Sequence, residues 1–334
     1  MKFGRVAVAR ALGAIVAHAV RHDAIALKKG QVIGAAQQAA LLAAGVAEIV
    51  AAELEPGDVG EDAAASRLAA RLAGEHLRAE RPFTGRVNLF AQRAGLVVVD
   101  AAAIARVNAV DEAITAATLA PFRRVAVGDM AATIKIIPFA VAGDKLALAL
   151  DAIGPGGGLR VAPFRALRIG VASTLLPGLK PSTVAKTLRI LQARLDPAGA
   201  SVAREERVGH EEAALADALA RMAPHCDALI VFGASAITDR RDVIPSAIVR
   251  LGGRIERFGM PVDPGNLLLL GSLGGLPVIG APGCARSPKE NGFDWVLHRL
   301  LAGVPIDGAD IRAMGAGGLL MEIATRPQPR LGDA

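Results

Sequence analysis

The chain has 334 residues, which is long for one average domain and sufficient for two hydrophobic cores. Its formal charge is +6, but Lys and Arg are scattered along the sequence, and no basic run is interleaved with stacking aromatics. This distribution argues against nucleic acid as a partner and favours a small phosphorylated ligand. Only 3% of the residues are aromatic, so we expect close backbone packing rather than large aromatic-lined pockets.

Cysteine usage and the apolar segments bear on the cellular compartment. Cys226 and Cys284 do not form a CxxC pair, so neither a disulfide framework nor a structural zinc site is expected. At the N-terminus, charged residues are interspersed among the apolar ones and His18 interrupts the apolar stretch, which argues against a secretory signal. Glycines and a proline break the apolar run 267–281, so it cannot span a membrane as a helix. We expect a cytoplasmic protein without membrane association.

Residues 1–160 predict an N-terminal α+β domain. The segment 31–44 has helical composition and stops at Gly45, and residues 46–54 then resemble a strand. Acidic residues from position 58 onward predict a second helix that runs to Leu77. Shorter β-rich segments follow at 95–99, 124–127 and 131–141. The cluster of Gly and Pro at 153–158 predicts a linker.

From residue 164 onward, apolar runs alternate with helical segments. Strands are predicted at 167–173, 228–232 and 277–279, and helices at 182–195, 213–222, 242–251 and 292–301. This alternation is typical of β-α-β units on a parallel sheet. The sequence therefore predicts an α/β domain over residues 164–310, with three layers and a mostly parallel sheet. A C-terminal tail, 311–334, follows it; its last part, 324–334, contains two prolines.

The first candidate ligand loop follows the strand that ends at Phe232 and precedes a helix. Ligands of open α/β sheets bind outside the carboxyl ends of the strands, where small residues expose backbone amides to an anion. Ser235 and Thr238 supply hydroxyl donors, while Asp239 and Asp242 suit a cation or the orientation of a phosphate. The alternative is that these residues are turn and N-cap residues of the next helix.

A second loop, 281–290, follows another apolar run and is expected at the same sheet edge. Its Arg286, Ser287 and Lys289 suit a phosphate or a carboxylate, although an ordinary turn with solvated charges has the same composition. A third segment, 262–266, is a Pro-Gly turn of a common kind.

Other side chains are weaker candidates for binding a ligand or taking part in a reaction. Lys186 and Thr187 begin a helix near the same edge, where they could reach a phosphate or simply be solvated. His210 precedes two glutamates, a group that suits a metal or a base but is more typical of a helix start. Cys284 lies near basic residues that would lower the pKa of its thiol, or it only lines the loop. No metal site is predicted.

Together the three loops resemble the molybdopterin-binding domain shared by molybdopterin molybdotransferase and molybdopterin adenylyltransferase, with the likeness extending over residues 164–310. Gly233, Ser235 and Asp242 are similar to the family's glycine-rich loop, Pro264-Gly265 to its turn and Pro282-Gly283 to its second loop. If the protein is an enzyme, Asp242 is the catalytic candidate, with the role of orienting a phosphate or a cation. The resemblance and the composition of the loops together give the residues expected to bind molybdopterin or its nucleotide form: Gly233, Ala234, Ser235, Thr238, Asp239, Asp263, Pro264, Gly265, Asn266, Pro282, Gly283, Cys284, Arg286, Ser287, Lys289, Lys186 and Thr187.

The chain departs from the family pattern at three places. The family's glycine pair is Gly233-Ala234 here, and lysines near the Pro-Gly turn are replaced by Asp263 and Asn266. The family's Thr-Gly-Asp-Glu-Leu stretch corresponds to residues 173–177, which contain neither acid. Because hard cations need carboxylate oxygens, this loss weakens the case for Mg²⁺ more than the case for the pterin.

The resemblance implies a protein of molybdenum cofactor biosynthesis or maturation, with a transferase-type activity or none. The alternatives are a non-catalytic carrier or sensor of the cofactor and a CinA-like nucleotide pyrophosphatase. The first half, through residues such as His18, Gly30 and Asn88, resembles an N-terminal part found in a bacterial subgroup of this family. That subgroup is often fused to a cytidylyltransferase-like domain, which this chain lacks. The partners implied are such a cytidylyltransferase or a molybdoenzyme, and a homo-oligomer is expected.

Overall fold

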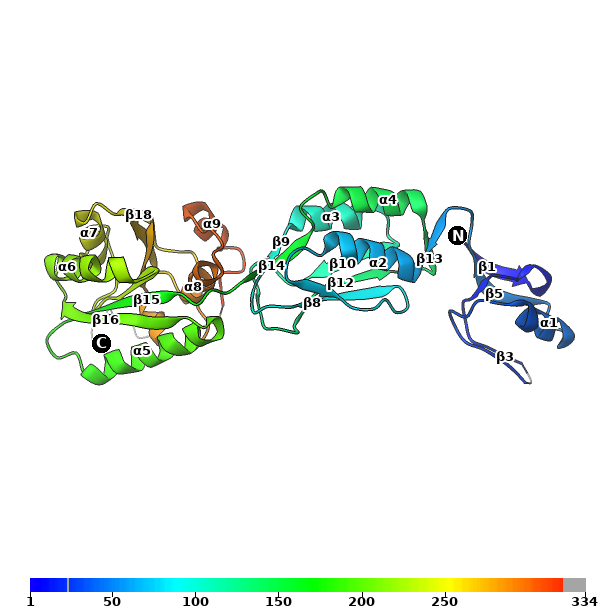
Figure 1. The fold of residues 1–334 in the computed structure, drawn as a ribbon, viewed down its shortest axis with the longest axis horizontal. Helices are drawn as coiled ribbons and strands as arrows, with labels where there is room; N and C mark the ends of the chain where they lie inside the picture. The colour runs from blue at the N-terminus through cyan, green and yellow to red at the C-terminus, as the bar shows by residue number, and fades with distance from the viewer. Residues whose placement is uncertain (23, 321–334) are drawn as a thin grey trace, which may run out of the picture. The chain divides into compact units, whose positions relative to one another are not determined.

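The computed structural model describes residues 1–22 and 24–320, and the chain divides into two compact units, Met1–Ala162 and Pro163–Ala334 (Figure 1). The predicted linker, 153–158, lies inside the first unit, directly before strand β14 (Leu159–Pro163). Within the described ranges, no helix is both long and apolar enough to cross a membrane. The end of the predicted tail, 324–334, lies outside the described residues.

The first unit begins with a small sheet of order β1-β5-β2 that has its own apolar cluster, which includes Val8 and Leu41. Its elements are β1 (Lys2–Ala7), β2 (Ile15–Val16), β3 (Val20–His22), β4 (Ile25–Leu27), α1 (Ala35–Ala43) and β5 (Glu48–Glu53). The predicted helix at 31–44 is confirmed in shortened form. It begins only at Ala35 because the backbone of residues 31–33 pairs with the segment around β2. Gly45 follows its end at a φ of 74°, a conformation that favours glycine.

A second core in the same unit contains a four-stranded sheet of order β10-β12-β8-β7. The elements are β6 (Asp58–Gly60), α2 (Glu61–Leu72), β7 (Leu77–Ala79), β8 (Arg86–Ala91), β9 (Gly95–Val99), α3 (Ala101–Val110), β10 (Ile114–Thr118), β11 (Arg124–Val125), β12 (Met130–Ile136), β13 (Ala140–Ala142) and α4 (Gly143–Ala152). The α+β prediction is confirmed. Helix α2 ends earlier than predicted, and the strand predicted at 131–141 is two strands separated by Pro138. The Ala-rich helices α3 and α4 were not predicted.

The second unit is built on a six-stranded sheet of order β16-β15-β17-β20-β19-β18. Its strands are β15 (Arg168–Leu175), β16 (Ser201–Gly209), β17 (Ala228–Phe232), β18 (Arg254–Phe258), β19 (Leu269–Leu273) and β20 (Leu276–Ala281). Strands β16, β15, β17 and β20 are parallel, and β19 pairs antiparallel with both β20 and β18. The helices are α5 (Pro181–Leu195), α6 (Glu212–Met222), α7 (Val243–Arg250), α8 (Gly292–Ala302) and α9 (Gly308–Ala313).

Helices cover both faces of this sheet, which confirms the predicted three-layer α/β architecture. Helices α5 and α8 bury Leu191 and Phe293 in one apolar cluster with β17, while α6 and α7 bury Leu215 and Ile248 in a second cluster on the other face. Every residue of β17 is buried, as expected for a central parallel strand.

Three strands of this sheet were not predicted, for two reasons. Strand β16 lies at one edge of the sheet, and its many charged residues leave no apolar run by which a strand is recognised. Strand β18 at the other edge is similarly rich in charged residues. The apolar run 267–281 is in fact the hairpin β19-β20, which turns at Gly274 and Gly275 with φ of 54° and 89°. Residues 311–320 pack on this unit, since Ile311 is buried and the amide of Leu320 donates to the carbonyl of Asp263 at 2.9 Å.

Candidate functional site

The carboxyl ends of β15, β17 and β20 lie side by side at one edge of the sheet. Ser173 is in register with Phe232, and Phe232 with Ala281, so the segments that follow these residues start as neighbours. We call residues 233–242 loop 1 and residues 282–290 loop 2. The Pro-Gly turn, 262–266, lies close to the end of loop 2. The amide of Gly292, two residues after that loop, donates to the carbonyl of Pro264 at 2.8 Å. The structure therefore brings the three predicted segments to one edge.

Arg286 of loop 2 links both loops to helix α5. Its Nη2 donates to the carbonyl oxygen of Gly233 in loop 1 at 2.9 Å, and its Nη1 donates to Oγ1 of Thr187 at 2.9 Å. The guanidinium also lies over the ring of Phe232, 5.3 Å from its centroid. Desolvation by burial lowers the pKa of Arg286, and among the described residues no ion pair is recorded for it. A half-buried positive charge is thus fixed where the two loops meet.

Arg194 of α5 braces the backbone of loop 2. Its Nε lies 2.6 Å from Oδ1 of Asp294, and both side chains are only 8% exposed. The same guanidinium donates to the carbonyl oxygens of Ala285 at 2.9 Å and Ser287 at 2.7 Å. Asp294 accepts from the amide of Asn291 at 2.9 Å, which completes a capping box at the start of α8. Sequence reasoning missed this brace because its members are about a hundred positions apart and carry no local signal.

Thr174 of β15 holds the first part of loop 1. Its Oγ1 accepts from the amide of Ala234 at 2.8 Å and lies 2.8 Å from Nδ1 of His210. Thr174 is almost completely buried and Ala234 is half-buried, so loss of this hydroxyl would leave the amide with limited access to a replacement acceptor. His210 therefore contacts the loop through Thr174. In the described part of the chain, no group of three or more His, Cys, Asp or Glu is arranged to hold a metal.

Replacing Thr174 by valine is expected to lower the free energy of unfolding by about 1–3 kcal/mol, because the amide of Ala234 loses its buried acceptor. Thr174→Ser keeps the hydroxyl and is the matched control, with a smaller loss from the missing methyl group. Urea unfolding of both variants measures the difference. Equal stability of the two would show that the hydroxyl does not hold loop 1.

Asp242 has the local role that the alternative interpretation gave it. It is the N-cap of α7, where Oδ1 accepts from the amide of Val243 at 2.8 Å and Oδ2 from the amide of Thr238 at 3.1 Å. Asp239 forms an exposed ion pair with Arg241 at 2.8 Å, which lowers the pKa of its carboxyl. Both carboxylates are therefore engaged within loop 1, and a catalytic role for Asp242 stays a prediction.

Of the two interpretations of Cys284, the structure does not support a thiol with a lowered pKa. Desolvation raises the pKa of this thiol, and that effect exceeds the influence of the nearby cations. Its Sγ lies 3.6 Å from Oδ1 of Asn291, so Cys284 packs against the end of loop 2. The interpretation of Cys284 as a lining residue is compatible with this position.

The remaining predicted residues occupy different positions on this edge. Lys186, Ser235 and Lys289 are exposed, whereas Thr187 is buried and its hydroxyl donates to the carbonyl of Thr183 at 2.8 Å. Thr187 thus orients Arg286. In the Pro-Gly turn, a Cβ on Gly265 would lie 2.9 Å from Cα of Gly292, and its φ of 148° also favours glycine. The residues not yet placed are Asp263, half-buried; Pro264 and Pro282, both buried; and Asn266 and Gly283, both exposed.

Residues 169–305 match the family model described as the probable molybdopterin binding domain. Over these residues the chain is similar to the domains of that family. The match lies wholly within the second unit and confirms the resemblance inferred from the three loops. No curated protein matches the chain.

Two solved structures are similar to the chain at low identity. A molybdopterin biosynthesis moea protein from Pyrococcus horikosii is 16% identical over 91% of this chain and 76% of its own, with a TM-score of 0.30. A molybdenum cofactor biosynthesis protein from Pyrococcus furiosus is 12% identical over 93% of this chain and 65% of its own, with a TM-score of 0.25.

Proposed function

We propose that the protein binds molybdopterin or its nucleotide form at the carboxyl edge of the second sheet, as a step in molybdenum cofactor biosynthesis. The observation that carries this proposal is Arg286, a half-buried guanidinium at the junction of loops 1 and 2 with no recorded ion pair in the described ranges. Its remaining donor capacity suits a phosphate, for which planar guanidinium groups are well matched. The match to a molybdopterin binding domain indicates that the phosphate belongs to a pterin.

The supporting groups divide into those that fix the loops and those that meet the ligand. Thr174 and Arg194 hold the backbones of loop 1 and loop 2 before any ligand arrives. Exposed Ser235 and Lys289 are available on the loops themselves. Two loops whose backbones are already held, with one half-buried cation between them, need little rearrangement to receive an anion. Binding therefore requires no movement of the sheet.

A non-catalytic carrier of the cofactor is our second candidate, because carboxylates at this edge are few and already engaged. Residues 173–177 contain no acid, and both oxygens of Asp242 accept backbone hydrogen bonds. A Mg²⁺-dependent transfer would need oxygen ligands from elsewhere, including the substrate. The cytoplasmic location, the homo-oligomer and a cytidylyltransferase or molybdoenzyme as partner stay predictions.

Incubation of the full chain with adenylylated molybdopterin distinguishes these activities. Release of AMP would indicate a transferase or hydrolase, whereas stoichiometric binding without product would indicate the carrier. A CinA-like pyrophosphatase would cleave dinucleotides that contain no pterin. Absence of any pterin binding, measured by fluorescence and by mass spectrometry of copurified ligand, would contradict the proposed function.

Two variants of Asp242 distinguish its structural role as the N-cap of α7 from a catalytic role of its carboxylate. Asp242→Ala is expected to lower the free energy of unfolding by about 0.5–2 kcal/mol, because α7 loses its cap. Asp242→Asn keeps an acceptor oxygen and is expected to restore most of that stability. Thermal unfolding of the two variants checks this result. If Asp242→Asn is as stable as the native chain but no longer releases product, the carboxylate itself has a catalytic role.

A further inference from the structure

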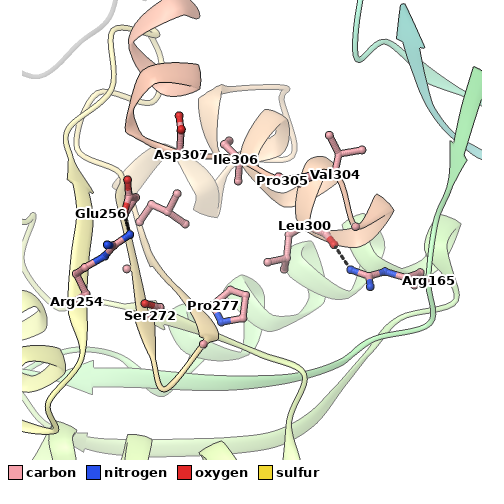
Figure 2. A pocket seen from close by; sticks show the side chains of 14 residues that line it. Arg165, Arg254, Glu256, Ser272, Pro277, Leu300, Val304, Pro305, Ile306 and Asp307 are labelled. Carbon is pink, nitrogen blue, oxygen red and sulfur yellow. Dashed lines mark hydrogen bonds and ion pairs between the residues drawn. The ribbon is translucent and has the colours of Figure 1, made fainter. Parts of the chain in front are cut away.

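A pocket of about 490 Å³ lies at the opposite, amino edge of the second sheet (Figure 2). Pro277, near the start of β20, and Arg165, three positions before β15, both line it. Loops 1 and 2 follow the other ends of the same sheet. Strands of five to eight residues separate the two edges by roughly 17–26 Å, at about 3.3 Å per residue. The pocket is therefore distinct from the candidate pterin site.

The inner wall of the pocket is apolar. Leu270 of β19 and Leu300 of α8 are 5% and 9% exposed and belong to the same core cluster, while Pro277 and Ile306 complete the wall. The volume falls within the range of roughly 300–1,000 Å³ that is typical of small-molecule sites. A flat apolar group would find both the space and the surface that it needs here.

One end of the pocket carries the guanidinium of Arg165. Its Nη2 donates to the carbonyl oxygen of Leu300 at 3.1 Å. A Cβ on Gly303 would lie 2.8 Å from Cζ of Arg165, so glycine at this position lets the guanidinium rest against the backbone. Among the residues that the structure describes, no ion pair is recorded for Arg165. Its charge contributes to the lowered pKa of Asp227, but the ion pair of Asp227 is with Arg168. The other N–H groups of Arg165 are therefore available to an anion.

The charges at the other end are arranged differently. Arg254 is paired with Glu256, and Glu256 also accepts from the amide of Gly308 at 3.3 Å. Asp307 caps α9, and hydrogen bonds from the backbone amides of Asp310 and Ala309 lower the pKa of its carboxyl, which keeps it ionised. Asp307 and Arg165 lie at opposite ends of the pocket in Figure 2. Arg312 and Arg299 also act on Asp307, so the charges at this end largely cancel and an anionic group is attracted to the Arg165 end.

From the apolar side chains of the inner wall and a guanidinium with no ion pair of its own we propose that this pocket binds a small organic acid with an apolar body, its carboxylate on Arg165 and its body against Leu270 and Leu300. The arrangement follows the usual division of a small-molecule site, in which apolar surface gives affinity and one polar group fixes orientation. The neutral Arg254–Glu256 pair leaves room for a hydrogen-bonding substituent at the far end of the ligand.

The test is calorimetric titration of the full chain with 2-naphthoate and, as the matched neutral probe, 2-naphthamide. The native chain is expected to bind the acid and to bind the amide about tenfold more weakly, since a charge-assisted bond to Arg165 is lost. Arg165→Met, which keeps most of the stem, should remove this preference. Arg189→Met removes an equivalent charge from the exposed face of α5 and should leave both affinities unchanged.

A second variant tests the location of the site. Ser272 lies on the same face of β19 as Leu270, so Ser272→Phe is expected to fill the pocket and abolish binding of the acid, with thermal unfolding as the check on folding. Equal affinity for acid and amide, no binding of either, or unchanged binding by Ser272→Phe would each overturn the proposal. Molybdopterin binding is expected to be unaffected by Arg165→Met, so this inference and the proposed function fail independently.

Discussion

Replacement of Arg286 by alanine is expected to weaken the binding of molybdopterin roughly 10- to 100-fold, the range of a lost charge-assisted hydrogen bond. Two effects act in the same direction. The ligand loses the cation at the junction of the loops, and the carbonyl of Gly233 loses the donor that ties loop 1 to loop 2. Fluorescence titration of the pterin against the full chain measures the change.

Two control variants separate the charge from the geometry of Arg286. Arg286→Lys keeps the charge but cannot donate to both Thr187 and Gly233, so an intermediate affinity is expected. Arg189→Ala removes a positive charge from the exposed surface of α5 and should bind like the native chain. If Arg286→Ala and Arg189→Ala lose the same small amount of affinity, the phosphate does not bind at this junction. Thermal unfolding must show that each variant is folded.

Replacement of Arg194 by alanine is expected to lower the free energy of unfolding by about 3–5 kcal/mol, because it leaves the buried carboxylate of Asp294 without its partner. The carbonyl oxygens of Ala285 and Ser287 lose their donor in the same step. Loop 2 should therefore become more mobile. Pterin binding should weaken even at urea concentrations at which the variant is still folded. Urea unfolding and hydrogen exchange of loop 2 amides measure the two effects.

An exposed ion pair provides the comparison for Arg194. Arg207 contacts Glu205 at 2.5 Å on strand β16, with side chains 41% and 30% exposed. Arg207→Ala is expected to change stability by about 0–1 kcal/mol, because solvent screens such pairs. If Arg194→Ala costs no more than Arg207→Ala, the brace is unimportant to the fold and loop 2 is held by other contacts.

The central part of the second unit was predictable because its signals are local. Strand β17 is an uninterrupted apolar run, and the helices α5 and α6 show helical periodicity next to it, so alternation alone indicated a parallel sheet. The edge strands β16 and β18 were not predictable in this way. Their charged side chains face solvent, and only pairing with β15 and β19 makes them strands.

The loops of the candidate site were predictable in position but not in detail. Loops 1 and 2 had to meet because each follows a strand of one parallel sheet. The link from Arg286 to Thr187 and the brace from Arg194 to Asp294 join positions about a hundred residues apart, and no local pattern encodes such contacts. The direction of the pKa shift at Cys284 was hidden for the same reason, since its neighbours in sequence are basic but its desolvation arises from packing.

The sequence by itself determined that the second half is an α/β domain with small-residue loops at the carboxyl ends of its strands, because periodicity and turn residues act over a few positions. Only the tertiary structure decided which side chains of those loops are engaged. It placed Asp242 on the amides of α7, buried Arg286 between two loops and left a pocket at the far edge of the sheet. The physical reason is that hydrogen-bond partners, burial and the cancellation of charge depend on distances in space. Those distances are fixed only when the strands pair and the helices pack on the sheet.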